Sequence, residues 1–171
     1  MKLYQELYKL KNTIRKGWLI VDAKSETGRV ESDAEHCFSM ALLGIEIMQK
    51  ENLPIDQQKT MKMILFHELG EAKIGDITPF DGVTKEEKFQ QEKLAVEQIA
   101  KECDMPEILS LWLEFEEGES AEAKFVNMLD KFDSVMQSKI YSDEAKDGEK
   151  IFKEFYNRYF EKFKKFDKYL H

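Results

Sequence analysis

Two of the three histidines in this chain stand beside carboxylates, in Glu35-His36 and His67-Glu68, whereas His171 is the terminal residue. Imidazole and carboxylate together form a ligand set suited to Co²⁺, Mn²⁺, Fe²⁺, Mg²⁺ or Zn²⁺. A lone histidine in a helical protein is usually an ordinary hydrogen-bonded residue. The acidic neighbours therefore make His36 and His67 candidate ligands of a divalent metal ion.

The segment from His67 to Asp76, HELGEAKIGD, combines a histidine with the carboxylates of Glu68, Glu71 and Asp76. If the segment turns at its two glycines, some of these acids face inward, where they are costly unless a cation neutralises them. The alternative is an acidic helix end that is exposed to solvent. The segment also begins like the zinc-protease motif HExxH, but Glu71 stands where the second histidine is required, which excludes that class.

A cationic and aromatic group, Arg15-Lys16-Gly17-Trp18, stands near the amino terminus of an acidic chain. Arginine can hold a phosphate with two hydrogen bonds, and an indole can stack on a sugar or base or block it sterically. The alternative is a surface arginine beside a tryptophan that fills the core. The local sequence alone favours this alternative.

The elements that must position these side chains are predicted to be helices. The chain has three prolines and eight glycines, and long stretches contain neither, which is typical of helices. Capping-box patterns predict helix starts at Ser32 and Thr84. The predicted helices cover residues 4–14 with an end near Gly17, 33–50, about 56 to near Gly70, 84–103, 106 to about 115 with an end near Gly118, 121–141 and 150–169, and residues 75–82 form a loop. We therefore predict an all-α fold, and the length of the chain fits a single domain over residues 1–171.

The charge and hydropathy patterns exclude some classes of partner. A formal net charge of −8 argues against a nucleic-acid groove, which needs a basic surface. The amino-terminal sequence lacks the apolar core of a signal peptide. The longest nearly apolar run, residues 40–48, contains Glu46 and is too short to span a bilayer. We therefore expect a cytoplasmic protein with neither nucleic acid nor membrane as a partner.

Four stretches, in this order, resemble the HD-domain phosphohydrolases, and in particular the 5′-deoxynucleotidases: RKGW at 15–18, ESDAEH at 31–36, HELGEAKIGDITP at 67–79 and LDKFD at 129–133. The resemblance implies a helical bundle of the HD type. It also implies one divalent metal ion held by His36, by the doublet His67-Glu68 and by a distant aspartate. Helical periodicity does not choose between Asp130 and Asp133 for that aspartate, but the family pattern selects Asp130.

The chain departs from the family pattern at the doublet, where Glu68 replaces the defining aspartate. Glutamate keeps the carboxylate but adds a methylene, which moves the oxygens outward by roughly one carbon–carbon bond. A changed metal preference or a lower rate is one expected consequence. Loss of metal binding is the alternative.

The resemblance further implies hydrolysis of a nucleoside 5′-monophosphate to a nucleoside and phosphate. Glu71 would position or deprotonate the water, and Asp76 would orient the sugar and assist proton transfer to the leaving oxygen, although these two roles could be exchanged. The implied substrate contacts are Arg15 for the phosphate, Trp18 for the space around the ribose 2′ position, and Ile77 and Thr78 for the wall of the nucleotide pocket.

Two alternatives stay open at this point. One keeps the HD site but changes the substrate to a cyclic nucleotide, a nucleoside triphosphate or an alarmone. The other is a non-catalytic helical regulatory module, in which Glu68 marks a degenerate metal site. A homodimer is expected under either reading, because the family tends to self-associate and the last helix carries an aromatic stripe suited to a core or an interface.

Overall fold

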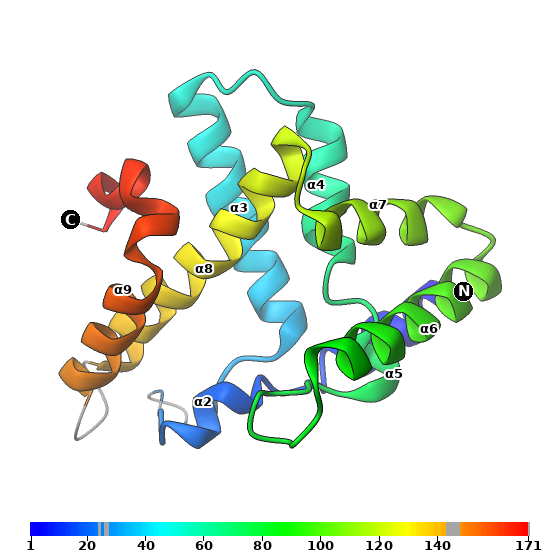
Figure 1. Cartoon of the computed structure of the whole chain (residues 1–171), viewed down its shortest axis with the longest axis horizontal. Helices are drawn as coiled ribbons and strands as arrows, with labels where there is room; N and C mark the ends of the chain where they lie inside the picture. Colours follow the sequence, from blue (N-terminus) through cyan, green and yellow to red (C-terminus); the bar gives the residue numbers. More distant parts are fainter. Residues whose placement is uncertain (24, 26–27, 143–147, 171) are drawn as a thin grey trace.

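The computed structural model describes residues 1–23, 25, 28–142 and 148–170, and His171 lies outside them. Over these residues the chain forms helices and no β-sheet (Figure 1), which confirms the all-α prediction. The helices are α1 (Lys2–Leu10), α2 (Lys16–Ile20), α3 (Asp33–Glu51), α4 (Gln57–Phe66), α5 (Glu71–Ile74), α6 (Lys85–Cys103), α7 (Pro106–Glu117), α8 (Ala121–Ser142), α9 (Gly148–Phe163) and the 3₁₀ helix η1 (Lys164–Tyr169). None of these described helices is long and apolar enough to cross a membrane.

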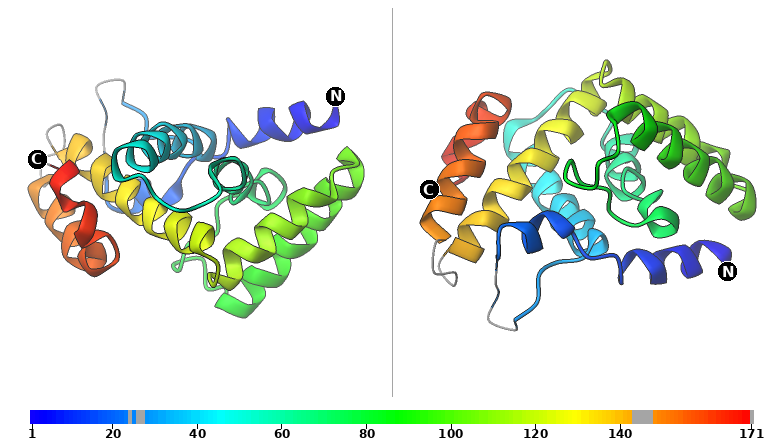
Figure 2. Two further views of the ribbon diagram at one scale, coloured as in Figure 1. Left: turned by 90° about the horizontal axis from the view of Figure 1, so that it is seen from above. Right: turned by 60° about the horizontal axis from the view of Figure 1, so that its bottom comes forward.

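Helices α3, α4 and α8 pack together at the centre of the molecule (Figures 1 and 2). Their apolar side chains form the largest buried cluster, which includes Met40, Ile64 and Phe132. A second cluster, around Val96 of α6 and Trp112 of α7, packs against α1. Helices α6 and α7 thus lie on one side of the central helices and α9 on the other (Figure 1).

Both predicted capping boxes are present. The side chain of Ser32 accepts a hydrogen bond from the backbone N–H of Glu35, and the carboxylate of Glu35 accepts one from the backbone N–H of Ser32. Thr84 and Glu87 make the same reciprocal pair at the start of α6. These pairs satisfy backbone donors that a helix start would otherwise leave free, and the first box fixes the turn that carries His36.

The prediction of one helix over residues 4–14 is wrong at its end. Helix α1 stops at Leu10, and Gly17 lies inside the separate helix α2 rather than at a helix end. Ile14 instead forms an antiparallel bridge with Ser32, and the flanking backbone groups are hydrogen-bonded across the same two segments. Because these bonds hold the backbone extended, they interrupt the helix and bring Arg15 next to the start of α3.

The helix predicted to stop near Gly70 ends earlier, at Phe66. The backbone then tightens into three-residue turns, such as the hydrogen bond from Glu71 N to Glu68 O at 3.0 Å. A Cβ atom on Gly70 would lie 3.1 Å from Cγ2 of Val96 on α6. Glycine therefore allows the turn to approach α6 closely, and the turn separates the His67-Glu68 doublet from α5.

The last predicted helix, residues 150–169, is α-helical only as far as Phe163 and continues as η1. Aromatic side chains of α9 pack against the central cluster, with Phe163 fully buried, as expected for a core stripe. The loop over residues 75–82 and the end of α7 at Gly118 agree with the predictions.

Candidate metal and substrate site

Two buried histidines from different helices face each other at the centre of the fold. His36 lies on α3 and His67 directly follows α4; they are 0% and 5% exposed, and their ring centroids are 5.7 Å apart. The Nε2 atoms of both rings are buried without a hydrogen-bond partner among the described residues. Because an unpartnered polar atom is costly in a protein interior, two such nitrogens close together fit ligation of a shared cation.

Glu68 and Asp130 extend this donor set. Ligand atoms of His36, His67 and Glu68 all lie within 4.8 Å of one another. Oε1 of Glu68 is 3.6 Å from Nε2 of His67, and Oδ1 of Asp130 is 3.3 Å from Nε2 of His36. The four residues that the family pattern names are thus brought together, and the longer side chain of Glu68 still reaches the group. Two imidazoles and two carboxylates suit a single divalent cation.

Asp133 lies on the opposite side of the His36 ring from Asp130. Its Oδ2 atom is 2.7 Å from Nδ1 of His36, and both side chains are buried. Asp130 and Asp133 are one turn apart on α8, so both reach the same imidazole. A proton on Nδ1 that is donated to Asp133 leaves the lone pair of Nε2 directed toward Asp130. Asp130 therefore lies on the side of Nε2, whereas Asp133 approaches Nδ1.

The pKa values of the two histidines move in opposite directions. Burial and the charge of Arg15 lower the pKa of His36, but the nearby carboxylates of Asp130 and Asp133 outweigh them and raise it to about 9. Burial lowers the pKa of His67. The carboxylates around His36 thus favour positive charge at this position.

Glu71 and Asp33 are buried acids beside the doublet. Burial, followed by repulsion from Glu68, Asp33 and Asp76, raises the pKa of Glu71 well above that of an ordinary carboxyl. Both oxygens of Asp33 are buried without a hydrogen-bond partner among the described residues, and burial followed by repulsion from Glu68 raises its pKa to about 7. The solvent-exposed interpretation is therefore wrong for Glu71. Buried acids with raised pKa values are suited to proton transfer.

A cavity of about 350 Å³ opens on this group. Its lining includes all six residues predicted for catalysis or substrate binding, together with two of the four predicted metal ligands: Arg15, Trp18, Glu71, Asp76, Ile77 and Thr78, and Glu68 and Asp130. Nη1 of Arg15 is 3.2 Å from Oε1 of Glu68, and Oδ2 of Asp76 accepts a hydrogen bond from the backbone N–H of Lys16 at 2.7 Å. The volume is in the range of small-molecule sites.

The sequence left two interpretations for Arg15 and Trp18: contacts to a phosphate and a sugar, or a surface arginine beside a tryptophan in the core. The structure gives a different answer for each residue. Arg15 is not a surface residue, because its guanidinium is largely enclosed between the carboxylates of Glu31 and Glu68. Trp18 is only 3% exposed, and its Nε1 donates a hydrogen bond to Glu31 at 2.8 Å. The indole thus belongs mostly to the core, although Trp18 also lines the cavity.

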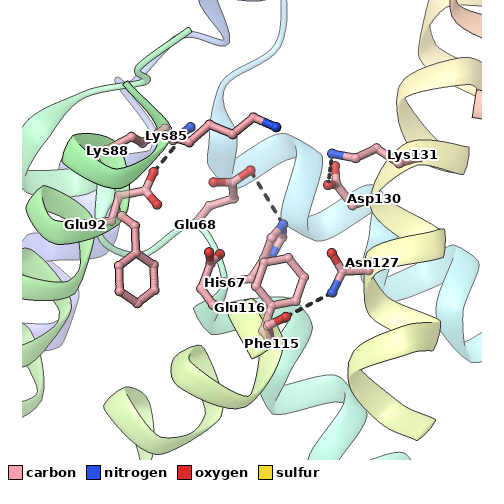
Figure 3. A pocket seen from close by; sticks show the side chains of 11 residues that line it. His67, Glu68, Lys85, Lys88, Glu92, Phe115, Glu116, Asn127, Asp130 and Lys131 are labelled. Atoms are coloured by element: carbon pink, nitrogen blue, oxygen red, sulfur yellow. Dashed lines mark hydrogen bonds and ion pairs between the residues drawn. The ribbon is translucent and has the colours of Figure 1, made fainter. Parts of the chain in front are cut away.

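Two cationic residues lie near the ligand group, which is made up of His36, His67, Glu68 and Asp130, and neither was predicted from the sequence. Figure 3 shows Lys131 directed toward Asp130, with 2.6 Å between the charged atoms, and Lys88 beside Glu92. Both lysines line the first cavity and also a second cavity of about 320 Å³, which shares Glu68 with the first. The position of Lys131 next to Asp130 was an available signal, whereas nothing in the sequence joined Lys88 of α6 to this site.

Comparisons with known proteins agree with this architecture. The family model described as "HD domain" matches residues 7–168. The "5'-deoxynucleotidase HDDC2" of Dictyostelium discoideum is 36% identical, over 82% of this chain and 78% of that protein. The "5'-deoxynucleotidase hdd1" of Schizosaccharomyces pombe is 34% identical, over 87% and 75% respectively. The crystal structure of the PH0347 protein from Pyrococcus horikoshii OT3 superimposes with a TM-score of 0.76, with 28% identity over 98% of this chain and 94% of that one. The chain therefore belongs to the HD-domain family.

Proposed function

We propose that this protein is a metal-dependent 5′-deoxynucleotidase that hydrolyses 2′-deoxynucleoside 5′-monophosphates to nucleoside and phosphate. The observation that carries the proposal is the pair of buried, unpartnered Nε2 atoms of His36 and His67, grouped with Glu68 beside a cavity that contains Arg15. The names of the relatives support the substrate class.

In this proposal one divalent ion, Co²⁺, Mn²⁺, Fe²⁺, Mg²⁺ or Zn²⁺, is held by His36, His67, Glu68 and Asp130. When bound, the ion supplies Lewis acidity at neutral pH and neutralises negative charge on the phosphate. The unpartnered histidine nitrogens and the nearby carboxylates fit this role.

The chain's own side chains carry the phosphate and the protons. Arg15 binds the phosphate oxygens, since its guanidinium lines the cavity and can donate two hydrogen bonds to a phosphate. Glu71, which is buried at the cavity wall beside Glu68, accepts a proton from the attacking water. Asp76 orients the sugar and assists proton transfer to the 5′ oxygen as the phosphorus–oxygen bond breaks. Its carboxylate is held at the cavity by the backbone of Lys16.

The remaining predicted residues shape the sugar pocket. Trp18 occupies the space that a ribose 2′-hydroxyl would need, which favours deoxyribose. Ile77 lines the wall, and Lys88 holds its carbonyl oxygen at 2.9 Å. Thr78 is buried and donates from its backbone N–H and its hydroxyl to Asp81, at 2.7 and 2.9 Å. We infer that Thr78 acts mainly by fixing the loop that carries Asp76.

Phosphate release tests the proposal. Metal-stripped protein is resupplied separately with each candidate ion and given 5′-deoxyribonucleoside and ribonucleoside monophosphates, cyclic nucleotides, nucleoside triphosphates and an alarmone. We expect metal-dependent release that favours the deoxy monophosphates. Release from another substrate class alone would assign a different HD phosphohydrolase. No release with any ion, from protein shown by circular dichroism to be helical, would favour the regulatory module.

A variant pair separates the chemical step from metal binding. Glu71→Gln should bind the metal ion nearly as well as the natural protein but lose at least about a hundredfold in rate, the usual size of a general-base contribution. Glu117→Gln, an exposed glutamate outside the described cavities, is the matched control. A Glu71→Gln protein with the original rate would remove Glu71 from the mechanism.

We further propose that residues 1–171 form one domain and that the protein is a homodimer. The HD match over residues 7–168 supports the first statement. For the second, α3 exposes Phe38, Leu42 and Ile45 at helical spacing, and exposed apolar stripes of this kind often mark association surfaces. Sedimentation equilibrium should give a dimer for the natural chain and a monomer for Leu42→Glu. A monomeric natural chain would contradict the proposal.

A further inference from the structure

The substrate cavity has an aromatic side that the hydrolysis of a phosphate ester does not require. Helix α9 contributes Phe155, Arg158 and Tyr159 to its lining. The ring of Phe155 stacks on Trp18, with centroids 4.9 Å apart and planes inclined by 20°. Phe155 and Tyr159 are one turn apart on α9, with ring centroids separated by 6.1 Å. Together these rings form a continuous aromatic wall next to the proposed sugar pocket.

The wall is joined directly to the ligand group by Lys131. Nζ of Lys131 is 2.6 Å from Oδ2 of Asp130 and 5.8 Å from the centroid of the Tyr159 ring. Tyr159 therefore lies one side chain away from a proposed metal ligand. A small ligand can therefore contact the proposed metal ligands at one end and the aromatic wall at the other.

The order of groups along the cavity matches the order of groups in a 5′-mononucleotide. Arg15, the proposed phosphate ligand, contacts Glu68. Trp18, the proposed sugar contact, follows one helical turn later in the sequence, and its ring stacks on Phe155 of α9. Because the base of a 5′-nucleotide lies beyond the sugar from the phosphate, a phosphate at Arg15 and a sugar at Trp18 direct the base toward α9.

Arg158 adds hydrogen-bond donors to this wall. Its side chain is 53% exposed, forms an ion pair with Glu154 on the same helix, and lies 5.9 Å from the centroid of the Phe155 ring. Exposed ion pairs of this kind contribute little free energy. The guanidinium can therefore exchange Glu154 for a carbonyl oxygen or ring nitrogen of a base at little cost.

We propose that Phe155, Arg158 and Tyr159 form a nucleobase subsite, in which a base stacks on the aromatic wall and accepts hydrogen bonds from Arg158. The assignment of a phosphorylated deoxynucleoside as the ligand rests on the proposed function. Stacking tolerates any base, because every base presents a π face. The subsite therefore selects for the presence of a base more than for its identity.

Binding of 2′-deoxyadenosine to metal-stripped protein tests the subsite without phosphate, metal or turnover. Ligand-observed NMR titration should show binding to the natural protein and about tenfold weaker binding to Tyr159→Leu, which keeps bulk but removes the π face. Tyr159→Phe should bind as the natural protein does, and so should Tyr8→Leu, which changes an exposed tyrosine on α1. No binding to the natural protein, or equal binding to Tyr159→Leu, would overturn the subsite.

A kinetic comparison separates this inference from the proposed function. With metal supplied, Tyr159→Leu should lower kcat/KM for 2′-deoxyadenosine 5′-monophosphate about tenfold and leave that for base-free 2-deoxyribose 5-phosphate unchanged. An equal loss for both substrates would show general damage to the site and count against the subsite. If the natural protein hydrolyses neither substrate but binds deoxyadenosine through Tyr159, the proposed function fails and the subsite stands.

Discussion

Asp133 holds the imidazole of His36 from the side opposite Asp130, through a 2.7 Å contact between its Oδ2 atom and Nδ1 of the ring. When the ring is neutral, a proton on Nδ1 can be donated to Asp133, and this contact directs Nε2 toward Asp130. In the proposed site, the orientation of the ligand His36 thus depends on Asp133, which is not itself one of the four proposed ligands.

Removing this orienting carboxylate should weaken metal binding without unfolding the protein. We expect Asp133→Asn to lower the affinity for Co²⁺ or Zn²⁺ by about 10- to 100-fold, the usual effect of losing such a partner, as measured by titration calorimetry. Asp104→Asn is the matched control, because Asp104 has a positive φ of 54° that asparagine also adopts readily. An unchanged affinity in Asp133→Asn would show that the ring is oriented by other contacts.

Glu68 should act through its carboxylate charge rather than through its length alone. Glu68→Gln keeps the size of the side chain but removes the charge, so we expect it to lose metal affinity by about tenfold or more and to weaken its 3.2 Å contact with Arg15. Glu68→Asp restores the doublet typical of the family and should retain binding. The two affinities, measured side by side for Co²⁺ and Mg²⁺, decide the point, and equal binding by Glu68→Gln would remove Glu68 from the ligand set.

Gly70 should be required for the close approach of the doublet turn to α6. A Cβ atom in Gly70→Ala would lie 3.1 Å from Val96 Cγ2 and 3.3 Å from the carbonyl oxygen of Glu92, and overpacking of this kind costs about 1–3 kcal/mol. Gly17→Ala is the contrasting control, since Gly17 lies inside α2 and a Cβ atom there would meet no atom within 4 Å. This variant should leave the free energy of unfolding unchanged or raise it by up to about 1 kcal/mol. Urea denaturation of both variants measures the difference, and equal free energies of unfolding would contradict the close approach.

Glu92 should make stability fall as the pH rises through neutrality. Burial raises its pKa to about 7 against the opposing charge of Lys88. A carboxyl whose pKa is higher in the folded state than in the unfolded state favours folding while protonated, so its contribution is present below about pH 4.5 and is lost as the pH rises through about 7. Glu92→Gln removes this titration. The free energy of unfolding of the variant minus that of the natural protein should therefore increase from pH 5 to pH 8, by on the order of 1–3 kcal/mol. A constant difference over this range would contradict the raised pKa.

Local signals predicted most helices but not the contacts that interrupt them. The capping boxes at Ser32 and Thr84 depend on residues three positions apart, so the sequence was sufficient to place both. The end of α1 depends on the bridge between Ile14 and Ser32, which joins distant segments and leaves no local pattern. The helix that ends at Phe66 was predicted to be too long for the same reason. The turn at Gly70 depends on packing against α6, a segment distant in the sequence.

The site was predictable where a motif carried it and hidden where side chains meet across the fold. His36, His67, Glu68 and Asp130 were named by resemblance, and the structure groups them. Periodicity could not separate Asp130 from Asp133, because both face the same imidazole and only the nitrogen that each approaches distinguishes them. The side chains from α6 and α9 that line the cavity stand in segments without a motif, so only the fold relates them to the site.

Every residue proposed to hold the metal, the phosphate or a transferred proton precedes the end of α8, whereas the aromatic wall comes from α9. In these proposals, the hydrolytic centre and the contacts to the base are therefore encoded in separate stretches of sequence. Substitutions in α9 can change which alcohol departs from the phosphate while the hydrolytic centre stays intact. Relatives with the same metal-binding residues but a different final helix would then prefer different phosphate esters. Replacing α9 of one chain with that of another is therefore a direct way to change substrate selectivity.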